Sequence, residues 1–427
     1  MIGTKKVGII LILAFFLITT RATSAQDSSS LSQDFWNISL DAYEEEPDVQ
    51  PDQADEGYLD YLRRRVNEIE APKGVISTTL PKRSGIVSYN YAYVTITHIR
   101  DKNGNRFPLI GDKDGYVSDD EPVAYSFHFD PKVNIQYHYL AFAVGLTDYF
   151  TSAVNFQFTK IDSLTNIEYL GGDFSDPELF WESAEFLYDR MEIVDYHTDG
   201  VEFGDISLIG KYRYYSSDLI GGAGYLEVRL PTSEPLDPNY SPELATGIGI
   251  PNGGRFESGR WAISLENDLD IFLPEPLNNF IFFTSQKYSI QIGGKLDSPT
   301  TTALLLEPAE EDWRDLGPTY EKKAGDAIFF DAGLSADILP FITTQVKYSF
   351  MCFLRSEYKS NLASFDEFMN EQAKTASVHH LEPQILFNLL HFKIPITISY
   401  SYSWPFFVRD FYEFPYHRIT TNLYYIF

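Results

Sequence analysis

The chain of 427 residues has little cysteine, few basic residues and, after its first 25 residues, no long apolar run. A single cysteine, Cys352, excludes an internal disulfide, so strand pairing and packing must hold the fold. Only 33 Lys and Arg oppose 61 Asp and Glu, a net charge of -28 that argues against a nucleic-acid partner. Because no later stretch approaches ~18 apolar residues, transmembrane helices are excluded there.

Aromatic residues are abundant instead, with 29 Tyr and 33 Phe making up most of a 16% aromatic fraction. The mean hydropathy of -0.21 resembles that of a soluble protein. A transmembrane β-barrel reconciles the two observations, because only alternate residues face lipid and aromatic girdles mark both membrane interfaces.

Three regions follow one another along the chain. Residues 1–25 combine Lys5 and Lys6, an apolar stretch and small residues before Ala25, which predicts a cleaved secretory signal peptide. Residues 26–84 form an acidic leader in which 56–70 has helical spacing; it could lie in the periplasm, dock on a partner or plug a barrel. Residues 85–427 are predicted to form the barrel.

Within that region, strand-like segments alternate with short and long links. The segments are 85–98, 132–145, 150–161, 203–215, 220–231, 259–273, 279–293, 325–338, 341–356, 378–390, 393–403 and 416–427. The long links are 99–122, 162–202, 232–257, 294–324, 357–377 and 404–415. Short periplasmic turns and long extracellular loops are typical of outer-membrane barrels. The fold class is therefore all-β, a transmembrane antiparallel up-and-down barrel of about 12 strands.

Alternation within the segments separates an apolar, lipid-facing parity from a polar, lumen-facing one. In 259–273, for example, Leu265 and Leu269 oppose Glu266, Asp268 and Asp270. A one-residue slip would turn the charges into hydrocarbon, at ~2–4 kcal/mol for each Lys or Arg near the midplane. Asn267 and Gln286 are outward exceptions, expected near an interface or a bulge. The predicted lumen-lining residues are Asp205, Lys211, Arg213, Glu227, Arg229, Glu266, Asp268, Asp270, Lys287, Asp331, Asp337, Lys347, Arg355, Glu382 and Arg418.

The end of the chain carries an assembly signal. Leu423, Tyr425 and Phe427 share one parity of the last strand, and this ending resembles the terminal strand of bacterial outer-membrane barrels, which finishes on Phe. The resemblance implies recognition by the barrel assembly machinery.

Local motifs between about Leu140 and Gly247 resemble a known family. These are the turn Gly145-Leu-Thr-Asp148, the strand start Gly204-Asp205-Ile206, Lys211-Tyr212, and Leu230-Pro-Thr232. They are similar to the core of the outer-membrane transporter-like family linked to the meta-pathway of phenol degradation. Here Ser233 and Glu234 follow where family members often have Gly. The resemblance implies an outer-membrane barrel that handles small organic solutes.

The polar residues have alternative interpretations. The inward charges either line a pore that selects solutes or form a structural network that fills the lumen. A helix predicted at 179–191 could gate the mouth or pack on external loops. Asp112, Asp114 and Gly115 suggest a calcium loop, but Gly comes too early, so turn chemistry is favoured. Asp101 to Gly104 is likewise a predicted turn.

No catalytic, metal or cofactor site is predicted. His379 and His380 are adjacent in a strand and point to opposite faces, so they do not readily share a metal ion, and His380 is expected inward. No histidine is followed two residues later by serine, the spacing of a barrel phospholipase family, so an enzyme is disfavoured.

The leading hypothesis is an outer-membrane channel or transporter for small organic solutes, aromatic or apolar ones included. The alternative is a closed structural or surface-binding barrel without transport. Outer-membrane lipid, the assembly machinery and a small-molecule solute are the predicted partners; the sequence does not identify the solute or the oligomeric state.

Overall fold

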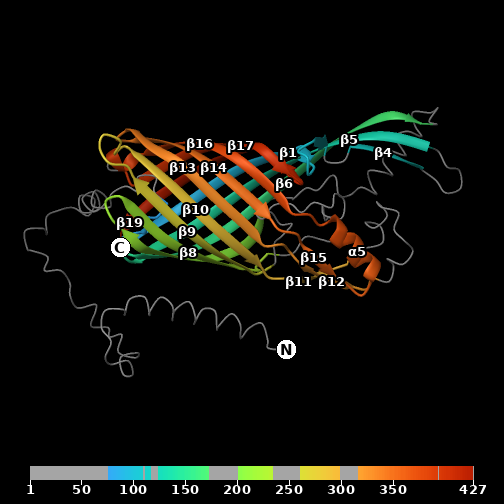
Figure 1. Cartoon of the computed structure of the whole chain (residues 1–427), viewed down its shortest axis with the longest axis horizontal. Coiled ribbons are helices and arrows are strands. Elements are labelled where there is room, and N and C mark those ends of the chain that lie inside the picture. The colour runs from blue at the N-terminus through green and yellow to red at the C-terminus, as the bar shows by residue number, and fades with distance from the viewer. Residues whose placement is uncertain are drawn as a thin grey trace, which may run out of the picture. The chain divides into compact units, whose positions relative to one another are not determined.

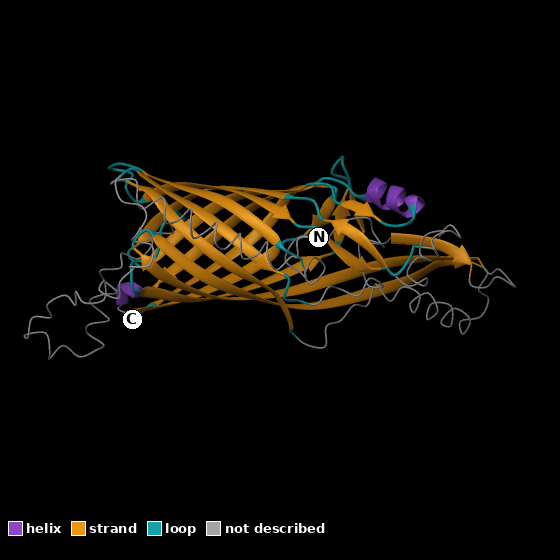
Figure 2. Ribbon diagram, turned by 90° about the horizontal axis from the view of Figure 1, so that it is seen from below, coloured by secondary structure: helices purple, strands orange, loops and turns teal. Residues whose placement is uncertain are grey.

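The computed structural model describes residues 76–108, 111–116, 124–172, 201–233, 260–298, 316–392 and 394–426. All of them belong to one compact unit, Tyr61–Phe427. Among these residues, 12 strands close into an antiparallel barrel (Figure 1 and Figure 2). They are β1 (Ser84–Ile96), β5 (Ala124–Thr147), β6 (Phe150–Gly172), β7 (Glu202–Ser216), β8 (Ile220–Leu230), β9 (Ala262–Phe272), β10 (Phe280–Gln291), β13 (Ala327–Leu339), β14 (Ile342–Phe353), β16 (Ala376–Asn388), β17 (Ile396–Arg409) and β19 (Tyr416–Ile426).

Each barrel strand pairs with its neighbour in sequence, and β1 closes the circle. On one side β1 pairs with β19, from Ser84 opposite Ile426 to Val94 opposite Tyr416. On the other it pairs with β5, from Gly85 opposite Val144 to Ile96 opposite Val133. The predicted all-β, up-and-down barrel of about 12 strands is therefore confirmed, and the barrel has 12.

The two ends of the barrel differ in their connections. At one end the connections are short: 148–149, 217–219, 273–279, 340–341 and 389–395, the last containing a 3-10 helix, Leu389–Phe392. The other connections are longer, except for the one between β17 and β19. We call the barrel end with the five short connections the short-turn end and the opposite end the long-loop end.

The long-loop end carries additional elements. They are β2 (His98–Arg100), β3 (Arg106–Pro108), β4 (Gly111–Tyr116), β11 (Gly294–Asp297), β12 (Thr319–Lys323), β15 (Glu357–Lys359), α5 (Ala363–Gln372) and β18 (Phe411–Glu413). Strand β18 pairs with β2, and β2 with β3; a second small sheet has the order β11-β12-β15. Helix α5 was not predicted; within the described residues, no helix is long and apolar enough to cross a membrane.

Helix α5 depends on tertiary packing. Its N-cap, Leu362, makes no side-chain capping hydrogen bond. Phe365 and Met369, one turn apart, are buried in a small core with Leu316, Tyr320 and Tyr358. Tyr358 lies in β15 just before the helix, whereas Leu316 and Tyr320 come from the connection that contains β12, so α5 depends in part on contacts with a distant part of the sequence.

Three predicted boundaries are wrong. Strands β5 and β6 continue past the point where β1 ends, pairing with each other as far as Tyr125 and Gly172, so 162–172 is strand rather than loop. The segment 112–115, predicted as a turn, lies in β4, which pairs with β5. Strand β17 runs on to Arg409, past the end predicted at residue 403. Pro405 does not end the strand, because it lies where the pairing with β16 shifts register, and a bulge tolerates a residue without a backbone N–H.

The turn predicted at Asp101 is confirmed, since the backbone N–H of Gly104 donates to the Asp101 carbonyl. The signal peptide, the leader helix at 56–70 and the loop helix at 179–191 lie outside the described residues.

The barrel wall alternates between an exposed apolar face and a buried polar one. Leu265 and Val346 are exposed on the outside, whereas Ser264 and Ser349, one parity away, are buried. Asn267, an outward exception, lies at the middle of β9 and accepts a hydrogen bond from the Tyr214 hydroxyl at 2.7 Å. Its amide oxygen therefore has a hydrogen-bond donor on the apolar face.

Candidate functional site in the barrel interior

Charged side chains on the inward face of β7 to β10 form ion pairs across the wall. The Lys211 ammonium lies 2.8 Å from the Asp268 carboxylate, and the Lys287 ammonium lies 2.7 Å from Glu227. Glu266 accepts a hydrogen bond from the Ser285 hydroxyl at 2.8 Å. Alternation places these groups at neighbouring positions, so opposite charges neutralise one another.

A second group of charges, centred on Glu382, lies across β13, β14, β16, β17 and β19. The Glu382 carboxylate pairs with the Lys347 ammonium at 3.1 Å and with the Arg418 guanidinium. It also accepts hydrogen bonds from the hydroxyls of Ser401 (2.6 Å) and Tyr416 (3.2 Å). Lys347 makes a second ion pair with Asp331 at 3.3 Å.

Glu382 is shielded from water, since 0% of the residue is exposed. A buried carboxylate is tolerated only when charges and hydrogen bonds compensate for lost water. With two cations and two hydroxyls around it, the group is fully compensated. This arrangement fixes five strands relative to one another on the inner face.

The segment before β1, residues 76–83, crosses the inner face of the barrel at the short-turn end; we call it the strap. The backbone N–H groups of Ile76 and Ser77 donate to the Asp270 carboxylate at 3.2 and 2.6 Å. The Lys211 ammonium donates to the Ile76 carbonyl. Leu80 N–H donates to the Thr151 hydroxyl at 2.7 Å. Strands β6, β7 and β9 therefore hold the strap through inward side chains.

Two glycines make room for the strap. A Cβ at Gly221 of β8 would lie 2.4 Å from the Ser77 hydroxyl oxygen. A Cβ at Gly145 of β5 would lie 2.0 Å from the Pro81 carbonyl oxygen, which belongs to the backbone and cannot rotate away. Glycine at these positions allows the close approach of a second chain segment to the barrel wall.

The interior becomes apolar toward the long-loop end, in a cluster that we call the cap. It combines inward residues of five barrel strands with residues of and beside β18. Its members are Val94, Ile96, Ile135, Ile161, Ala376, Val378, Val408, Phe411, Tyr412 and Phe414. Phe411 stacks on Phe353 of β14 with ring centroids 5.0 Å apart. The chain after β17 thus folds inward and packs against the barrel interior.

A histidine and a serine lie between the cap and the Glu382 charges. Ser403 Oγ and His380 Nδ1 share a hydrogen bond of 2.8 Å, and both residues are 0% exposed. The His380 ring contacts Phe414 at a centroid distance of 4.8 Å. Its Nε2 has no hydrogen-bond partner. Hydrolysis by this pair would require a substrate to reach it, and full burial prevents that in this conformation.

The predicted lumen-lining residues fall into groups. Lys211, Glu227, Glu266, Asp268 and Lys287 come together on β7 to β10, while Asp331, Lys347, Glu382 and Arg418 come together around Glu382. Asp270 holds the strap. Asp205 accepts hydrogen bonds from the backbone and hydroxyl of Ser233, with Arg229 3.9 Å away.

Three of the predicted residues lie away from these groups. Arg213 lies near the short turn and donates to the Asp148 carbonyl at 3.0 Å. Asp337 accepts a hydrogen bond from Thr343 near the β13–β14 turn. Arg355 follows the end of β14 and is exposed.

The cap was missed by the sequence prediction, and for the strap, which lies in the leader 26–84, insertion into the barrel was one of three alternatives left open. The sequence does contain a signal for the cap, because the inward-facing residues of a strand change from polar to apolar near the long loops. In β14, Ser349 is followed by Met351 and Phe353, and in β16, His380 is preceded by Val378. The strap has no comparable periodic signal, because most of its contacts are made by its backbone groups.

The described residues contain no group of three or more His, Cys, Asp or Glu placed to hold a metal ion. The described part of the interior carries ion pairs, aromatic rings and apolar side chains.

The fold was compared with known proteins. No protein-family model matches the chain, and no curated protein matches it significantly. The crystal structure of the COG4313 outer membrane channel from Pseudomonas putida F1 is similar, with a TM-score of 0.50 and 10% identity over 82% of this chain and 98% of that one. The Pseudomonas putida toluene transporter TodX aligns with a TM-score of 0.32 and 9% identity over 83% and 96% of the chains. At these identities the likeness shows only the fold, that of an outer-membrane β-barrel.

Proposed function

We propose that the protein conducts small, mainly apolar organic solutes, aromatic ones among them, across the outer membrane. The observation that carries the proposal is the change of polarity along the interior. A solute arriving from the long-loop end meets the apolar and aromatic side chains of the cap, and then a belt of mutually neutralised charges. An apolar entrance favours apolar solutes, because their transfer out of water costs little free energy.

The barrel size supports this proposal. Eight strands give an interior that side chains fill, whereas sixteen leave an aqueous channel. Twelve strands give an intermediate interior, which here also holds the strap and the cap. A path through it is narrow, and it suits one small molecule at a time better than bulk water flow.

We also infer the route by which the chain reaches the membrane. Residues 1–25 would direct export and then be cleaved, and the terminal strand would recruit the barrel assembly machinery. The exposed apolar band of β9 and β14, with Leu265 and Val346, supports insertion into lipid. Membership of the phenol-degradation transporter-like family is part of the same proposal, supported by the motifs between Leu140 and Gly247.

The second candidate function is a closed structural barrel without transport. The strap at one end and the cap at the other favour it, since both ends of the interior hold well-packed protein. The two functions differ in whether the strap and the cap can move aside to let a solute pass.

The test is uptake of toluene and of benzyl alcohol into proteoliposomes, measured beside single-channel conductance in planar bilayers. Uptake above that of protein-free liposomes is expected for the unmodified chain. Asp270→Asn removes the carboxylate that holds Ile76 and Ser77, so conductance is expected to rise as the strap loosens. Asp218→Asn, in the exposed β7–β8 turn, removes the same charge at the same end and should leave conductance unchanged.

The transport proposal fails if none of the proteins takes up solute and if D270N has the same conductance as the unmodified chain. The closed structural barrel would then explain the structure better.

A further inference from the structure

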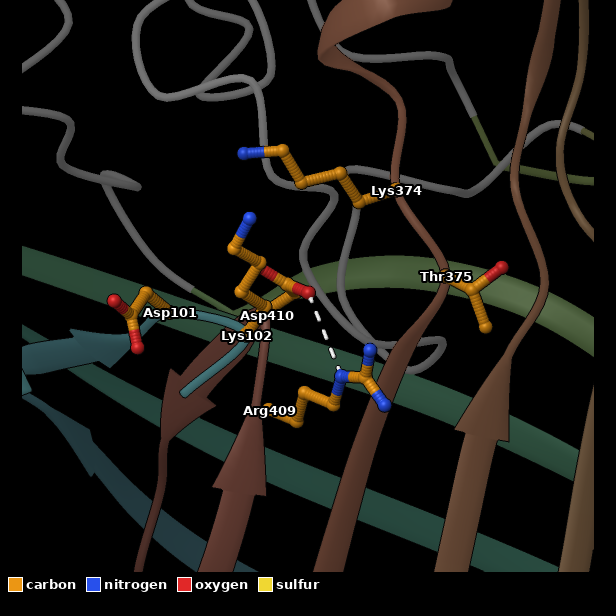
Figure 3. Close-up of a pocket in the computed structure, with 6 residues that line it drawn as sticks. All are labelled: Asp101, Lys102, Lys374, Thr375, Arg409 and Asp410. Atoms are coloured by element: carbon orange, nitrogen blue, oxygen red, sulfur yellow. Dashed lines mark ion pairs between the residues drawn. The ribbon is translucent and has the colours of Figure 1, made fainter. Parts of the chain in front are cut away.

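A cavity of about 480 Å³ lies at the long-loop end, outside the cap. Its lining residues come from three places in the chain: Asp101 and Lys102 between β2 and β3, Lys374 and Thr375 before β16, and Arg409 and Asp410 at the end of β17 (Figure 3). The volume is within the range of small-ligand sites. None of these residues belongs to the interior described above.

Strand pairing brings the segments together. Phe411 of β18 is opposite Arg100 of β2, which places Asp410 beside Asp101. Arg409 is opposite Ser377 of β16, two residues from Thr375. Asp410 has a positive φ of 48°, a conformation that Asp tolerates better than most residues, and the chain turns there from β17 into β18. The cavity is thus fixed by two ladders and a backbone reversal.

The cavity is cationic in a strongly acidic chain. Lys102, Lys374 and Arg409 face two carboxylates, those of Asp101 and Asp410. Just beyond it, Arg100 and Arg106 share a single carboxylate, Glu413, at 3.1 and 3.2 Å. Counting both groups, five cations meet three carboxylates. The excess of positive charge is local, because the whole chain carries a net charge of -28.

The two carboxylates of the cavity do little to neutralise its lysines. Asp101 already accepts hydrogen bonds from the backbone N–H groups of Asn103 (2.8 Å) and Asn105 (2.9 Å), and from the Asn105 amide (2.9 Å). Asp410 is 3.9 Å from the Arg409 guanidinium, beyond hydrogen-bond distance. Among the described residues, neither Lys102 nor Lys374 forms an ion pair.

The carboxylate of Asp101 stays ionised. Desolvation raises its pKa, but the hydrogen bonds from Asn105 and Asn103 outweigh that effect and hold the pKa below its ordinary value. Asp101 therefore keeps its negative charge in the cavity, and Lys102 and Lys374, both exposed, are accessible to a further anion.

We propose that this cavity binds an oxyanion, a carboxylate or a phosphate, at the long-loop rim of the barrel. The ammonium groups of Lys102 and Lys374 and the guanidinium of Arg409 are donors that make strong charge-assisted hydrogen bonds to such oxygens. The oxyanion could belong to a free organic acid or to the phosphate of an outer-membrane lipid headgroup. Binding at the rim is independent of passage through the interior.

The experiment compares three forms of the full-length protein in detergent at low salt. They are the unmodified protein, the double variant K102Q/K374Q, and the control K295Q/K359Q, which removes two exposed lysines from β11 and β15. Benzoate and inorganic phosphate are titrated by ligand-observed NMR, and lipid phosphorus that co-purifies with each protein is measured after extraction. Heat-modifiable migration in gels confirms that each form is folded.

We expect K102Q/K374Q to bind benzoate or phosphate about tenfold more weakly, the loss expected for one or two charge-assisted hydrogen bonds. This result supports the site if the affinity of the control stays within the wild-type range. Lower lipid phosphorus in K102Q/K374Q alone supports it with the lipid headgroup as the source. Equal affinities and equal lipid phosphorus in all three proteins would overturn the proposal. So would an equal loss in the control, because the effect would then be general surface charge.

Discussion

At the residue scale, Glu382 is the most consequential polar side chain of the interior. It has no exposed surface, and it connects Lys347 of β14 with Arg418 of β19. Such a pair gives little net stabilisation relative to apolar packing, since desolvation offsets attraction. Removing the Glu382 charge is costly, because Arg418 would lose this ion pair and Lys347 would keep only Asp331 as its partner.

The substitution Glu382→Gln should therefore lower the free energy of unfolding by about 3–5 kcal/mol. The measurement is urea unfolding of the protein in lipid vesicles, followed by tryptophan fluorescence. The control is Glu357→Gln, whose side chain is 73% exposed and lies 4.0 Å from Lys323; it should cost about 0–0.5 kcal/mol. A similarly small effect of E382Q would mean that water enters the site and solvates the cations.

At the element scale, β18 and its flanking residues distinguish this barrel from a simple cylinder. The connection between β17 and β19 is short, yet it places Phe411, Tyr412 and Phe414 inside the wall. Phe411 is 2% exposed and contacts the rings of Phe353, Tyr412 and Phe414. The element is thus part of the apolar core at the long-loop end.

The substitution Phe411→Ala should lower the free energy of unfolding by about 3–5 kcal/mol through the cavity that it leaves. Ion conductance in planar bilayers should rise, because an aromatic ring is removed from the narrow end. Phe107→Ala, on the exposed strand β3 at the same end, should change stability by about 0.5 kcal/mol or less. Lost stability with unchanged conductance would show that the cap does not obstruct the path.

At the scale of the whole molecule, the apolar band decides the medium in which the barrel is stable. Leu265 is 56% exposed and lies two residues from the middle of β9. In water, an exposed leucine can be replaced by a charged residue with little loss. In a bilayer, the same position faces hydrocarbon, and a charge there is costly.

Leu265→Arg should lower the free energy of unfolding in lipid vesicles by about 2–4 kcal/mol. Leu277→Arg makes the same change in the β9–β10 turn, where the cost should be about 0–1 kcal/mol, as expected near an interface. Both are measured by urea unfolding in the same vesicles. If L265R and L277R cost equally little, the band does not face lipid, and the membrane assignment is wrong.

The sequence by itself determined the fold class and a strand number of about 12, and it predicted the side of the wall for the charges within the strands. Period-two alternation is local, and so Glu266 and Leu265 could be assigned to opposite faces without any knowledge of their neighbours. The positions of the short turns followed as well, because the alternation stops there, whereas β5 (24 residues) and β6 (23 residues) extend beyond their predicted bounds.

Only the tertiary structure decided what occupies the interior and the rim. The strap is held largely through its backbone groups, which have no side-chain signature. Helix α5 is stabilised by Tyr320 from another connection together with Tyr358 from its own. The pairing of Ser403 with His380, the five-strand environment of Glu382 and the meeting of Lys102 with Lys374 all depend on barrel closure. Closure sets which residues become neighbours across strands, and no pattern along a single strand contains that information.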